Sequence, residues 1–411
     1  MQQNCDIAII GGGAAGFFAA ISCKTHNPST RVTLYEKTDK LLAKVKISGG
    51  GRCNVTHACF SNSQLSGFYP RGGKQLKKAF SQFTTTDTIK WFEGRGVRLK
   101  TEEDGRMFPV TDSSQTIINC LIREAEKLGI DIQVHQTLLD IEQENNKFKL
   151  RFRDNTIYAD KVIVASGGSP KLEGFDWLKK LGHIIEPPVP SLFSFNMPDE
   201  PVKSLMGISV ENASIRIQGT KLRTEGALLI THWGMSGPAI LKLSAWAART
   251  LKELDYSFTV QVNWLGNMNE DEARKILMEE ITAHPKRQLN NGNLFSLPNR
   301  LFIFLLSKLE INPDITMEEL GKKSQNRLLN TLLNDEYKVR GKTTFKEEFV
   351  TCGGISLTNI SLDTMESNIC PGLYFAGEVL DIDGITGGFN FQAAWTTGFI
   401  AGKLLSKQII G

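Results

Sequence analysis

Three glycines near the start of the chain have the spacing of a phosphate-binding turn. Gly11, Gly13 and Gly16 follow the run 6–10, which is short, apolar, rich in β-branched residues and typical of a strand buried on both faces. In a G-x-G-x-x-G pattern the first glycine makes a tight turn, the second lets the backbone approach a pyrophosphate, and the third lets the next helix pack on the strand. Unpaired N–H groups at the start of that helix favour phosphate. The pattern predicts a dinucleotide site.

An acidic residue follows at the distance that such a site requires. The run 31–35 predicts a second strand, which ends at Glu36. A carboxylate there can accept hydrogen bonds from both hydroxyls of an adenosine ribose, and it would repel a 2′-phosphate, which argues against NADP at this position. Because strand, glycine turn, helix, second strand and terminal acid coincide, an ordinary strand-to-helix turn is the weaker alternative.

A second glycine-rich segment lies shortly after that acid. Three consecutive glycines, 49–51, are flanked by Ser48, Arg52 and Asn54. The glycines would let the backbone wrap closely round a planar or phosphorylated ligand, and the polar side chains would donate hydrogen bonds to it. A flexible loop is the alternative. The position directly behind the dinucleotide strands favours ligand contact.

Two later strands end in the same way. The run 161–165 predicts a buried strand, and after Ala165 the backbone at Gly167 could again approach the cofactor. The run 372–376 predicts another strand, which stops at Gly377 and Glu378. A final helix is expected from about 391 to 406. A pattern typical of dinucleotide-binding folds therefore occurs again near the C-terminus.

The predicted fold class is α/β, with a Rossmann-like domain that contains a parallel sheet and a β-meander crossover. Between the second strand and residue 165 we expect helices at 74–96 and 114–128, a hairpin at 97–109, and a meander formed by 131–134, 138–142, 148–152 and 156–159.

The middle of the chain lacks nucleotide motifs. Pro187, Pro188 and Pro190 cannot continue a helix or a central strand, so we place a domain boundary there. The pattern then favours strands up to about 264 and helices from 268 to 334. We expect a discontinuous nucleotide-binding domain, an inserted β-barrel-like domain and a helical subdomain, with bounds of 1–188 plus 348–411, 189–266 plus 336–347, and 267–335.

Composition narrows the class of protein. The chain has 411 residues, 41% of them hydrophobic, which suffices for two or three domains with real cores. Its net charge of +4 is spread without a long basic block and does not by itself imply nucleic acid or membrane. Seven scattered cysteines without a C-x-x-C pair indicate a reducing compartment and give no zinc-ligand spacing. We therefore expect a cytoplasmic protein with no metal site and no membrane partner.

With these motifs together, the chain resembles the bacterial BaiN-type (YhiN-like) FAD-dependent oxidoreductases, over essentially its full length. The resemblance is carried by I-I-G-G-G-A-A-G at 9–16, I-S-G-G-G-R-C-N-V-T at 47–56, G-R-M-F-P at 105–109, T-H-W-G-M-S-G-P at 231–238, T-C-G-G-I at 351–355, T-M-E-S at 364–367 and the block 372–402. Ser166 and Cys352 depart from the residues that are commoner in the family. The resemblance implies FAD, a glutathione-reductase-like FAD-binding domain and the three-part organisation. Members of the family are named for different substrates. These range from amino ketones, as in the aminoacetone oxidase-like flavoproteins, to steroid-like acids.

The resemblance also implies which residues would hold FAD. The pyrophosphate would lie on Gly11, Gly13, Ala14, Ala15 and Gly16, with Glu36 on the adenosine ribose, Lys37 at its rim and the Leu138 backbone near adenine. The rest of the cofactor would lie along Lys44, Ser48, Gly49, Gly50, Arg52, Cys53, Asn54, Gly377, Glu378, Asn390, Phe391, Gln392 and Ala393.

Because flavin would carry the redox chemistry, no catalytic triad is expected. His232 is the sharpest candidate for proton transfer, although it could instead brace a domain junction. Arg106 could bind a substrate carboxylate or pair with Glu102 or Glu103. Cys53 could act as a redox thiol, but it has no second cysteine at C-x-x-C spacing.

The leading functional expectation is an enzyme that moves hydride equivalents between a small organic substrate and tightly bound FAD, with O₂, NAD(P)H or another carrier closing the cycle. No second G-x-G-x-x-G follows a strand in the middle of the chain, so NAD(P)H is expected only as a transient donor. Two alternatives stay open. One is an NAD(P)H-dependent reductase of an unsaturated substrate. The other is a flavin-bearing RNA-associated protein, which the lack of an aromatic-interleaved basic patch disfavours. The sequence does not specify the substrate or the oligomeric state.

Overall fold

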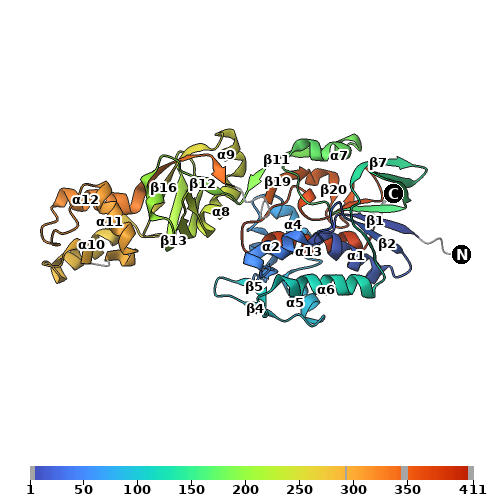
Figure 1. Ribbon diagram of the computed structural model, residues 1–411, viewed down its shortest axis with the longest axis horizontal. Coiled ribbons are helices and arrows are strands. Elements are labelled where there is room, and N and C mark those ends of the chain that lie inside the picture. Colours follow the sequence, from blue (N-terminus) through green and yellow to red (C-terminus); the bar gives the residue numbers. More distant parts are fainter. Residues whose placement is uncertain (1–4, 292–293, 344–349, 406–411) are drawn as a thin grey trace. The chain divides into compact units, whose positions relative to one another are not determined.

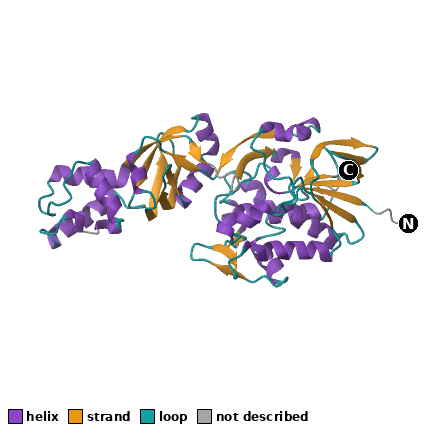
Figure 2. Cartoon of the chain, in the orientation of Figure 1, coloured by secondary structure: helices purple, strands orange, loops and turns teal. Residues whose placement is uncertain are grey.

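The computed structural model describes residues 5–291, 294–343 and 350–405. These residues form two compact units, shown in Figures 1 and 2. The first unit consists of the described residues of Met1–Ser191 and Lys346–Gly411, and the second of those of Leu192–Phe345. None of the described helices is long and apolar enough to cross a membrane.

A seven-stranded sheet is the centre of the first unit, in the order β20-β21-β22-β10-β1-β2-β6. Five neighbouring strands, β22 to β6, are parallel, which confirms the predicted Rossmann-like fold. The strands of this sheet are β1 (Asp6–Ile10), β2 (Arg31–Tyr35), β6 (Asp131–Gln133), β10 (Lys161–Val164), β20 (Ile360–Ser361), β21 (Glu366–Ser367) and β22 (Leu373–Phe375).

Helices α1 (Ala14–His26) and α13 (Phe389–Gly402) pack closely side by side in the first unit (Figure 1). Small residues on α13 make this possible. A Cβ added at Gly398 would lie 2.7 Å from the carbonyl oxygen of Ala15, and one added at Gly402 would lie 2.5 Å from that of Ala19. The close packing fixes the C-terminal half of α13 against the first turns of α1.

Two predicted elements differ from the observed ones. Residues 131–133 form the edge strand β6 of the parallel sheet, so the meander has only three strands, β7 (Leu138–Glu144), β8 (Lys147–Phe152) and β9 (Thr156–Ala159). The helix predicted at 74–96 is two helices, α4 (Gly73–Ala79) and α5 (Thr85–Glu93). The break occurs because Thr84 and Asp87 form a capping box that starts α5.

Shorter elements complete the first unit. The predicted hairpin is β4 (Leu99–Thr101) and β5 (Arg106–Pro109), and β3 (Thr56–His57) pairs with β5 to extend it. The prolines near residue 188 lie inside strand β11 (Ile185–Ser191), which pairs irregularly with β19 (Val350–Ile355) in a two-stranded sheet. The remaining helices of four or more residues are α2 (Ala43–Gly51), α3 (Asn62–Ser66), α6 (Ser114–Lys127), the 3₁₀ helix Leu172–Phe175 and α7 (Asp176–Lys180).

The second unit has a seven-stranded sheet in the order β17-β16-β13-β14-β15-β12-β18. Its strands are β12 (Ser194–Asn196), β13 (Ser209–Ile217), β14 (Arg223–Ile230), β15 (Gly234–Ser236), β16 (Ser257–Asn263), β17 (Asp335–Arg340) and β18 (Lys342–Thr343). Two helices, α8 (Pro238–Trp246) and α9 (Ala248–Glu253), interrupt the region for which only strands were predicted. Pro238 stands in the first turn of α8, where a proline costs no hydrogen bond.

Three further helices, α10 (Glu270–Ala283), α11 (Asn299–Lys308) and α12 (Lys322–Asn334), belong to the same unit. Their apolar residues share one continuous core with the sheet, since Ile215 and Val260 of the strands belong to the same cluster as Leu277, Leu305 and Leu328 of the helices. The sheet and the helices therefore stabilise each other.

A buried carboxylate joins the sheet to the helices of this unit. Asp335 accepts hydrogen bonds from the indole of Trp264 at 2.9 Å, from the ammonium group of Lys308 at 2.5 Å and from the hydroxyl of Tyr337. Asp335 is only 3% exposed. All three donors would lose their acceptor if this side chain were removed.

We therefore expect Asp335→Ala to lower the free energy of unfolding by about 3–5 kcal/mol, as is typical when one partner of a buried charged pair is removed. Urea unfolding followed by tryptophan fluorescence measures this loss. Glu211→Ala, at an exposed position of strand β13, serves as the control and should change stability by at most about 0.5 kcal/mol. Equal stability of the two variants would contradict the role of Asp335.

Candidate functional site

The glycine turn after β1 leaves its middle open. A Cβ added at Gly11 would lie 2.3 Å from the carbonyl oxygen of Ala165, and one added at Gly16 would lie 1.9 Å from that of Gly11. By contrast, nothing lies within 4 Å of a Cβ added at Gly13. Helix α1 begins at Ala14 with Gly13 as its N-cap, so no side chain caps its first turn. This is the arrangement that a pyrophosphate needs.

Glu36 stands at the end of β2, beside the glycine turn. One carboxylate oxygen accepts a hydrogen bond from the Gly12 N–H at 2.8 Å, and the other accepts from the Thr38 N–H and hydroxyl at 3.0 Å each. Lys37 is exposed next to it. The carboxylate is thus fixed at the edge of the sheet where the predicted ribose would lie.

The segment 48–53 has a backbone that only glycines adopt easily. Gly49, Gly50 and Gly51 have φ values of 58°, 68° and 83°, and a Cβ at Gly49 would lie 2.9 Å from the ring of Phe108. Cys53 also has a positive φ, 62°, and its N–H donates to the Ser48 carbonyl at 2.9 Å. The three glycines are therefore a requirement of the conformation.

Hydrogen bonds fasten the residues after this loop to the start of α13. The Asn54 amide donates to the Thr56 carbonyl at 2.9 Å and accepts from the Gly388 N–H at 3.0 Å. His57 donates from Nδ1 to the carbonyl of Gly387 at 3.1 Å, and its ring stacks on Phe389 at 4.6 Å.

The same two segments also meet below the surface. The indole of Trp395 donates to the Val55 carbonyl at 2.9 Å, and the Thr56 hydroxyl donates to Oε1 of Gln392 at 2.6 Å. Thr88 donates to the same oxygen at 2.9 Å. We call these contacts between residues 54–57 and α13, together with Thr88, the α13 clamp.

Two residues that were predicted to touch the cofactor have side chains committed to the protein. Gln392 is fully buried and donates to Thr396 at 3.1 Å, besides accepting from the two threonines of the clamp. Asn390 accepts from the Gly384 N–H at 2.8 Å and donates to the Gly384 carbonyl at 2.9 Å. Cofactor contact at these positions stays a prediction, and with both side chains bonded to the protein it would come from the helix backbone.

The side chains of Phe391 and Ala393 on α13 also pack against the protein. The ring of Phe391 stacks on that of Trp395 at 5.6 Å, and Ala393 is buried. Gly388, the N-cap of the helix, carries no side chain. The first turn of α13 therefore presents backbone N–H groups.

Glu378 lies after the end of β22 and is held from two sides. Its carboxylate accepts from the Lys44 ammonium group at 2.6 Å and from the Thr351 N–H at 2.8 Å. Gly377 needs its positive φ of 76° and its lack of a side chain, because a Cβ would lie 2.7 Å from that of Ala15. A Cβ at Gly167 would meet nothing within 4 Å, so the end of β10 is open as well.

Leu138 opens strand β7 and pairs with Phe152 of β8. The ring of Phe152 packs on that of Tyr35 at 4.8 Å, immediately before Glu36. The meander is thereby placed next to the predicted ribose carboxylate.

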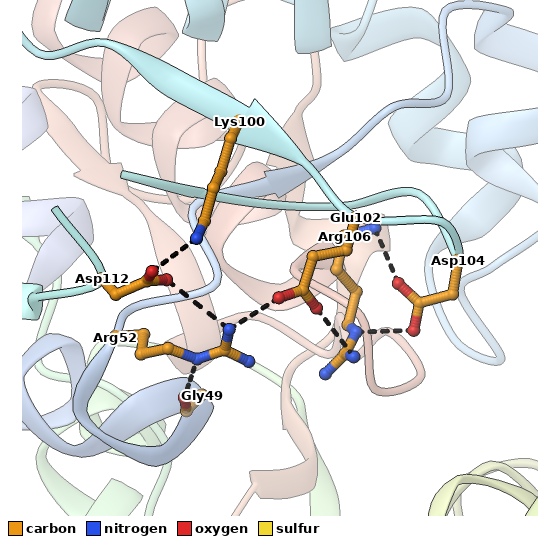
Figure 3. A network of polar contacts seen from close by, with 7 residues as sticks. All are labelled: Gly49, Arg52, Lys100, Glu102, Asp104, Arg106 and Asp112. Carbon is orange, nitrogen blue, oxygen red and sulfur yellow. Dashed lines mark hydrogen bonds and ion pairs between the residues drawn. The ribbon is translucent and has the colours of Figure 1, made fainter. Parts of the chain in front are cut away.

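Arg106 belongs to an ion-pair network that Figure 3 shows. Its guanidinium contacts Glu102 at 2.9 Å and Asp104 at 2.6 Å. The sequence suggested that Arg106 binds a substrate carboxylate or pairs with Glu102 or Glu103. In the structure it pairs with Glu102, and its second partner is Asp104, not Glu103. Arg106 already has two carboxylate partners.

Arg52 enters the same network from the glycine loop. It contacts Glu102 at 2.6 Å and Asp112 at 3.6 Å, and it lies 4.0 Å from the ring centre of Phe108. The hydrogen bond to Glu102 raises the pKa of Arg52. Lys100 pairs with the same Asp112. The network joins the hairpin β4–β5 to the glycine loop.

The other two chemical candidates fare differently. His232 is exposed in the second unit, where its ring lies 4.3 Å from that of Trp233, and its catalytic role stays a prediction. Cys53 is fully buried, and burial raises the pKa of its thiol to about 12. A thiol that stays protonated at neutral pH is a poor nucleophile, which disfavours a redox role. Among the described residues, no cluster of His, Cys, Asp and Glu side chains could hold a metal ion.

These observations fit FAD. Open backbone at Gly13 and Gly167, a carboxylate at the end of β2 and two uncapped helix N-termini lie within one unit. The fold and this set of groups define an FAD-dependent oxidoreductase.

Residues 5–404 match the model of the HI0933-like protein Rossmann domain, and the chain belongs to this family. It is 30% identical over 406 residues to the ribosomal RNA dihydrouridine synthase of Escherichia coli (strain K12), a match that covers 96% of each chain. The Haemophilus influenzae protein of the same name is 30% identical over 420 residues, with 99% of this chain and 100% of the relative covered.

A third relative has a different name. The 3-dehydro-bile acid delta(4,6)-reductase of Clostridium scindens is 26% identical over 410 residues, and the match covers 98% of this chain and 99% of the relative. Among solved structures, 3-ketosteroid delta1-dehydrogenase from Sterolibacterium denitrificans superposes with a TM-score of 0.52 at 10% identity, covering 98% and 99% of the two chains. That likeness concerns the fold alone.

The sequence reasoning missed the residues that hold α13 in place. Thr88, His57 and Trp395 carry no recognisable cofactor motif. The adjacency of Thr56 and His57 to the glycine loop was the available signal. Their hydrogen-bond partners, Gln392 and Gly387, lie more than 300 residues further along the chain.

We expect Gly13→Ala to weaken FAD binding at least about tenfold without lowering the stability of the apoprotein, because the added methyl group enters only open space. Gly16→Ala should instead destabilise the fold, since its methyl group would collide with the Gly11 carbonyl. Flavin fluorescence titration and thermal unfolding of the apoproteins measure the two effects.

Gly321→Ala is the matched control, because a Cβ there also meets nothing within 4 Å and the site lies in the second unit. Unchanged FAD affinity in Gly13→Ala would contradict the placement of the pyrophosphate.

Proposed function

We propose that this protein is a flavin-dependent reductase that adds hydrogen to a carbon–carbon double bond, and that its substrate is uridine in ribosomal RNA. The observation that carries the proposal is the match at 30% identity, over nearly the full length, to two proteins named ribosomal RNA dihydrouridine synthase. The leading expectation from the sequence had been a small organic substrate, with RNA disfavoured.

The direction of the reaction has further support. Both names among the relatives, dihydrouridine synthase and delta(4,6)-reductase, describe the addition of hydrogen to an unsaturated ring. An oxidase cycle with O₂ has no comparable support. We therefore assign reduction of the substrate as the working direction and NAD(P)H as the transient hydride donor.

Bound FAD would supply the hydride chemistry. The chain itself would have to bind the cofactor, orient it and polarise it. Open backbone at Gly13 and Gly167 leaves room for the pyrophosphate and the ribityl chain. The first turn of α13 would face the pyrimidine end of the flavin. A helix N-terminus favours negative charge by about 0.3–1 kcal/mol when exposed, and by more when partly buried, so it would stabilise the reduced anion.

The α13 clamp would hold that helix end in place during turnover. Its central residue, Gln392, is fully buried and hydrogen-bonded at both ends of the amide, so the first turn has little freedom to relax. A preorganised dipole acts without reorganisation at the moment of reaction. The proposed role of α13 depends on this rigidity.

RNA is compatible with the charge of the chain. The net charge of +4 is modest, so RNA contacts through scattered Lys and Arg side chains would be weak and strongly dependent on salt. We place the protein in the cytoplasm, where ribosomal RNA is available.

A second candidate substrate is an unsaturated steroid acid, favoured by the 26% identity to the bile acid reductase over 98% of this chain. A small apolar substrate would need no basic surface. The proposed catalytic role of His232, as a proton donor, would apply to either substrate.

Anaerobic transfer of hydrogen tests these proposals. Flavin of the purified protein should bleach with NADPH or NADH and recover its colour when unmodified ribosomal RNA is added, and mass spectrometry of the digested RNA should detect dihydrouridine. A parallel reaction uses a steroid acid with conjugated double bonds.

Recovery of colour with the steroid acid alone would replace the RNA assignment by the second candidate. Failure of both nicotinamides to bleach the flavin, together with bleaching by an amine or an alcohol, would overturn the reductase assignment.

A further inference from the structure

An ion pair spans the predicted cofactor groove of the first unit. The ammonium group of Lys44 lies 2.6 Å from the carboxylate of Glu378, although the two residues are separated by 334 positions in the chain. Lys44 belongs to α2, which follows β2, and Glu378 belongs to the short 3₁₀ turn Gly377–Val379, which follows β22.

The sheet order shows what lies between the two residues. Strands β22, β10, β1 and β2 are consecutive neighbours and parallel, so their carboxyl ends share one edge. The pair joins the segments after the two outer strands. The two inner strands, β10 and β1, lead into the open backbone at Gly167 and Gly13. A pyrophosphate on these glycines would therefore lie between the two segments that the ion pair joins.

Both ends of the pair are anchored to the walls of the groove. Glu378 also accepts from the Thr351 N–H at 2.8 Å and packs on Gly168, where a Cβ would lie 2.9 Å from its carboxylate. On the other side, the start of α2 is tied to the glycine turn, since the Leu42 N–H donates to the Gly12 carbonyl at 2.8 Å. Only the long Lys44 side chain has to move for the pair to open.

Both side chains of the ion pair are partly exposed to solvent. The Lys44 side chain is 50% exposed and that of Glu378 is 20% exposed. An ion pair of this kind is held by modest electrostatic attraction and weakens as salt is added. Such a contact can open and close on the timescale of side-chain motion.

We propose that the Lys44–Glu378 ion pair closes over bound FAD and retains it. The pair has to open for the cofactor to enter or leave, so it slows release more than it contributes to contact with the ligand. This role concerns retention of FAD and is independent of the proposed substrate, so its test uses no substrate.

The test measures FAD release from the holoprotein as the rise in flavin fluorescence after dilution. Lys44→Gln and Glu378→Gln should each accelerate release about fivefold, the loss typical of one partly exposed ion pair. The double variant Lys44→Gln/Glu378→Gln should release FAD no faster than either single variant, because each single change already breaks the same pair. Lys46→Gln, an exposed position on the same helix, is the matched control and should release FAD at the original rate.

Two other results would overturn the closure. If Lys44 acts on the phosphates alone, Lys44→Gln accelerates release while Glu378→Gln slows it or leaves it unchanged, because an anion near the phosphates is removed. If each residue contacts FAD separately, the double variant releases FAD faster than either single variant. A variant that purifies without flavin is first reconstituted with FAD, and a double variant that then fails to hold FAD while both single variants hold it counts against the closure.

Discussion

The site depends on the hydrogen bonds of the α13 clamp, which join the segment after the glycine loop to a helix at the far end of the chain. The Thr56 hydroxyl and the Trp395 indole bond across this junction at 2.6 and 2.9 Å. Because the partners are buried, breaking one bond would leave an unsatisfied polar group at a cost of about 1–3 kcal/mol. The clamp therefore holds the first two turns of α13 against the segment that directly follows the glycine loop.

The groove itself is built mainly from backbone. Glycines occupy the positions where a side chain would collide with a neighbouring carbonyl, as at Gly11 and Gly16, and also positions that face open space, as at Gly13 and Gly167. The charged side chains at its borders bond first to the protein, as Glu36 does to the Gly12 N–H. A site of this kind holds a cofactor by shape and by N–H groups, and leaves the reaction to the cofactor.

Local patterns in the sequence predicted local structure well. The strand, turn and helix around Gly11, and the acid at Glu36, follow from spacing alone. Contacts between distant residues could not be predicted, and Gln392 shows why: its acceptor oxygen serves Thr56 and Thr88, which lie 336 and 304 positions away. The strand at 131–133 was assigned to the meander because a short edge strand has the same alternation whether its neighbour is parallel or antiparallel. The break before Thr85 depended on a capping box that helical periodicity concealed.

We propose that the start of α13, held by the clamp, stabilises negative charge on the flavin. The two-electron midpoint potential of bound FAD, measured by equilibration with a reference dye, tests this claim most directly. We expect the midpoint potential of bound FAD to be at least about 20 mV more positive than that of free FAD. This difference corresponds to roughly 1 kcal/mol of stabilisation of the reduced anion. Gln392→Met, which removes the clamp's central amide, should move the potential back toward the free value. A bound potential equal to or below that of free FAD would contradict the account.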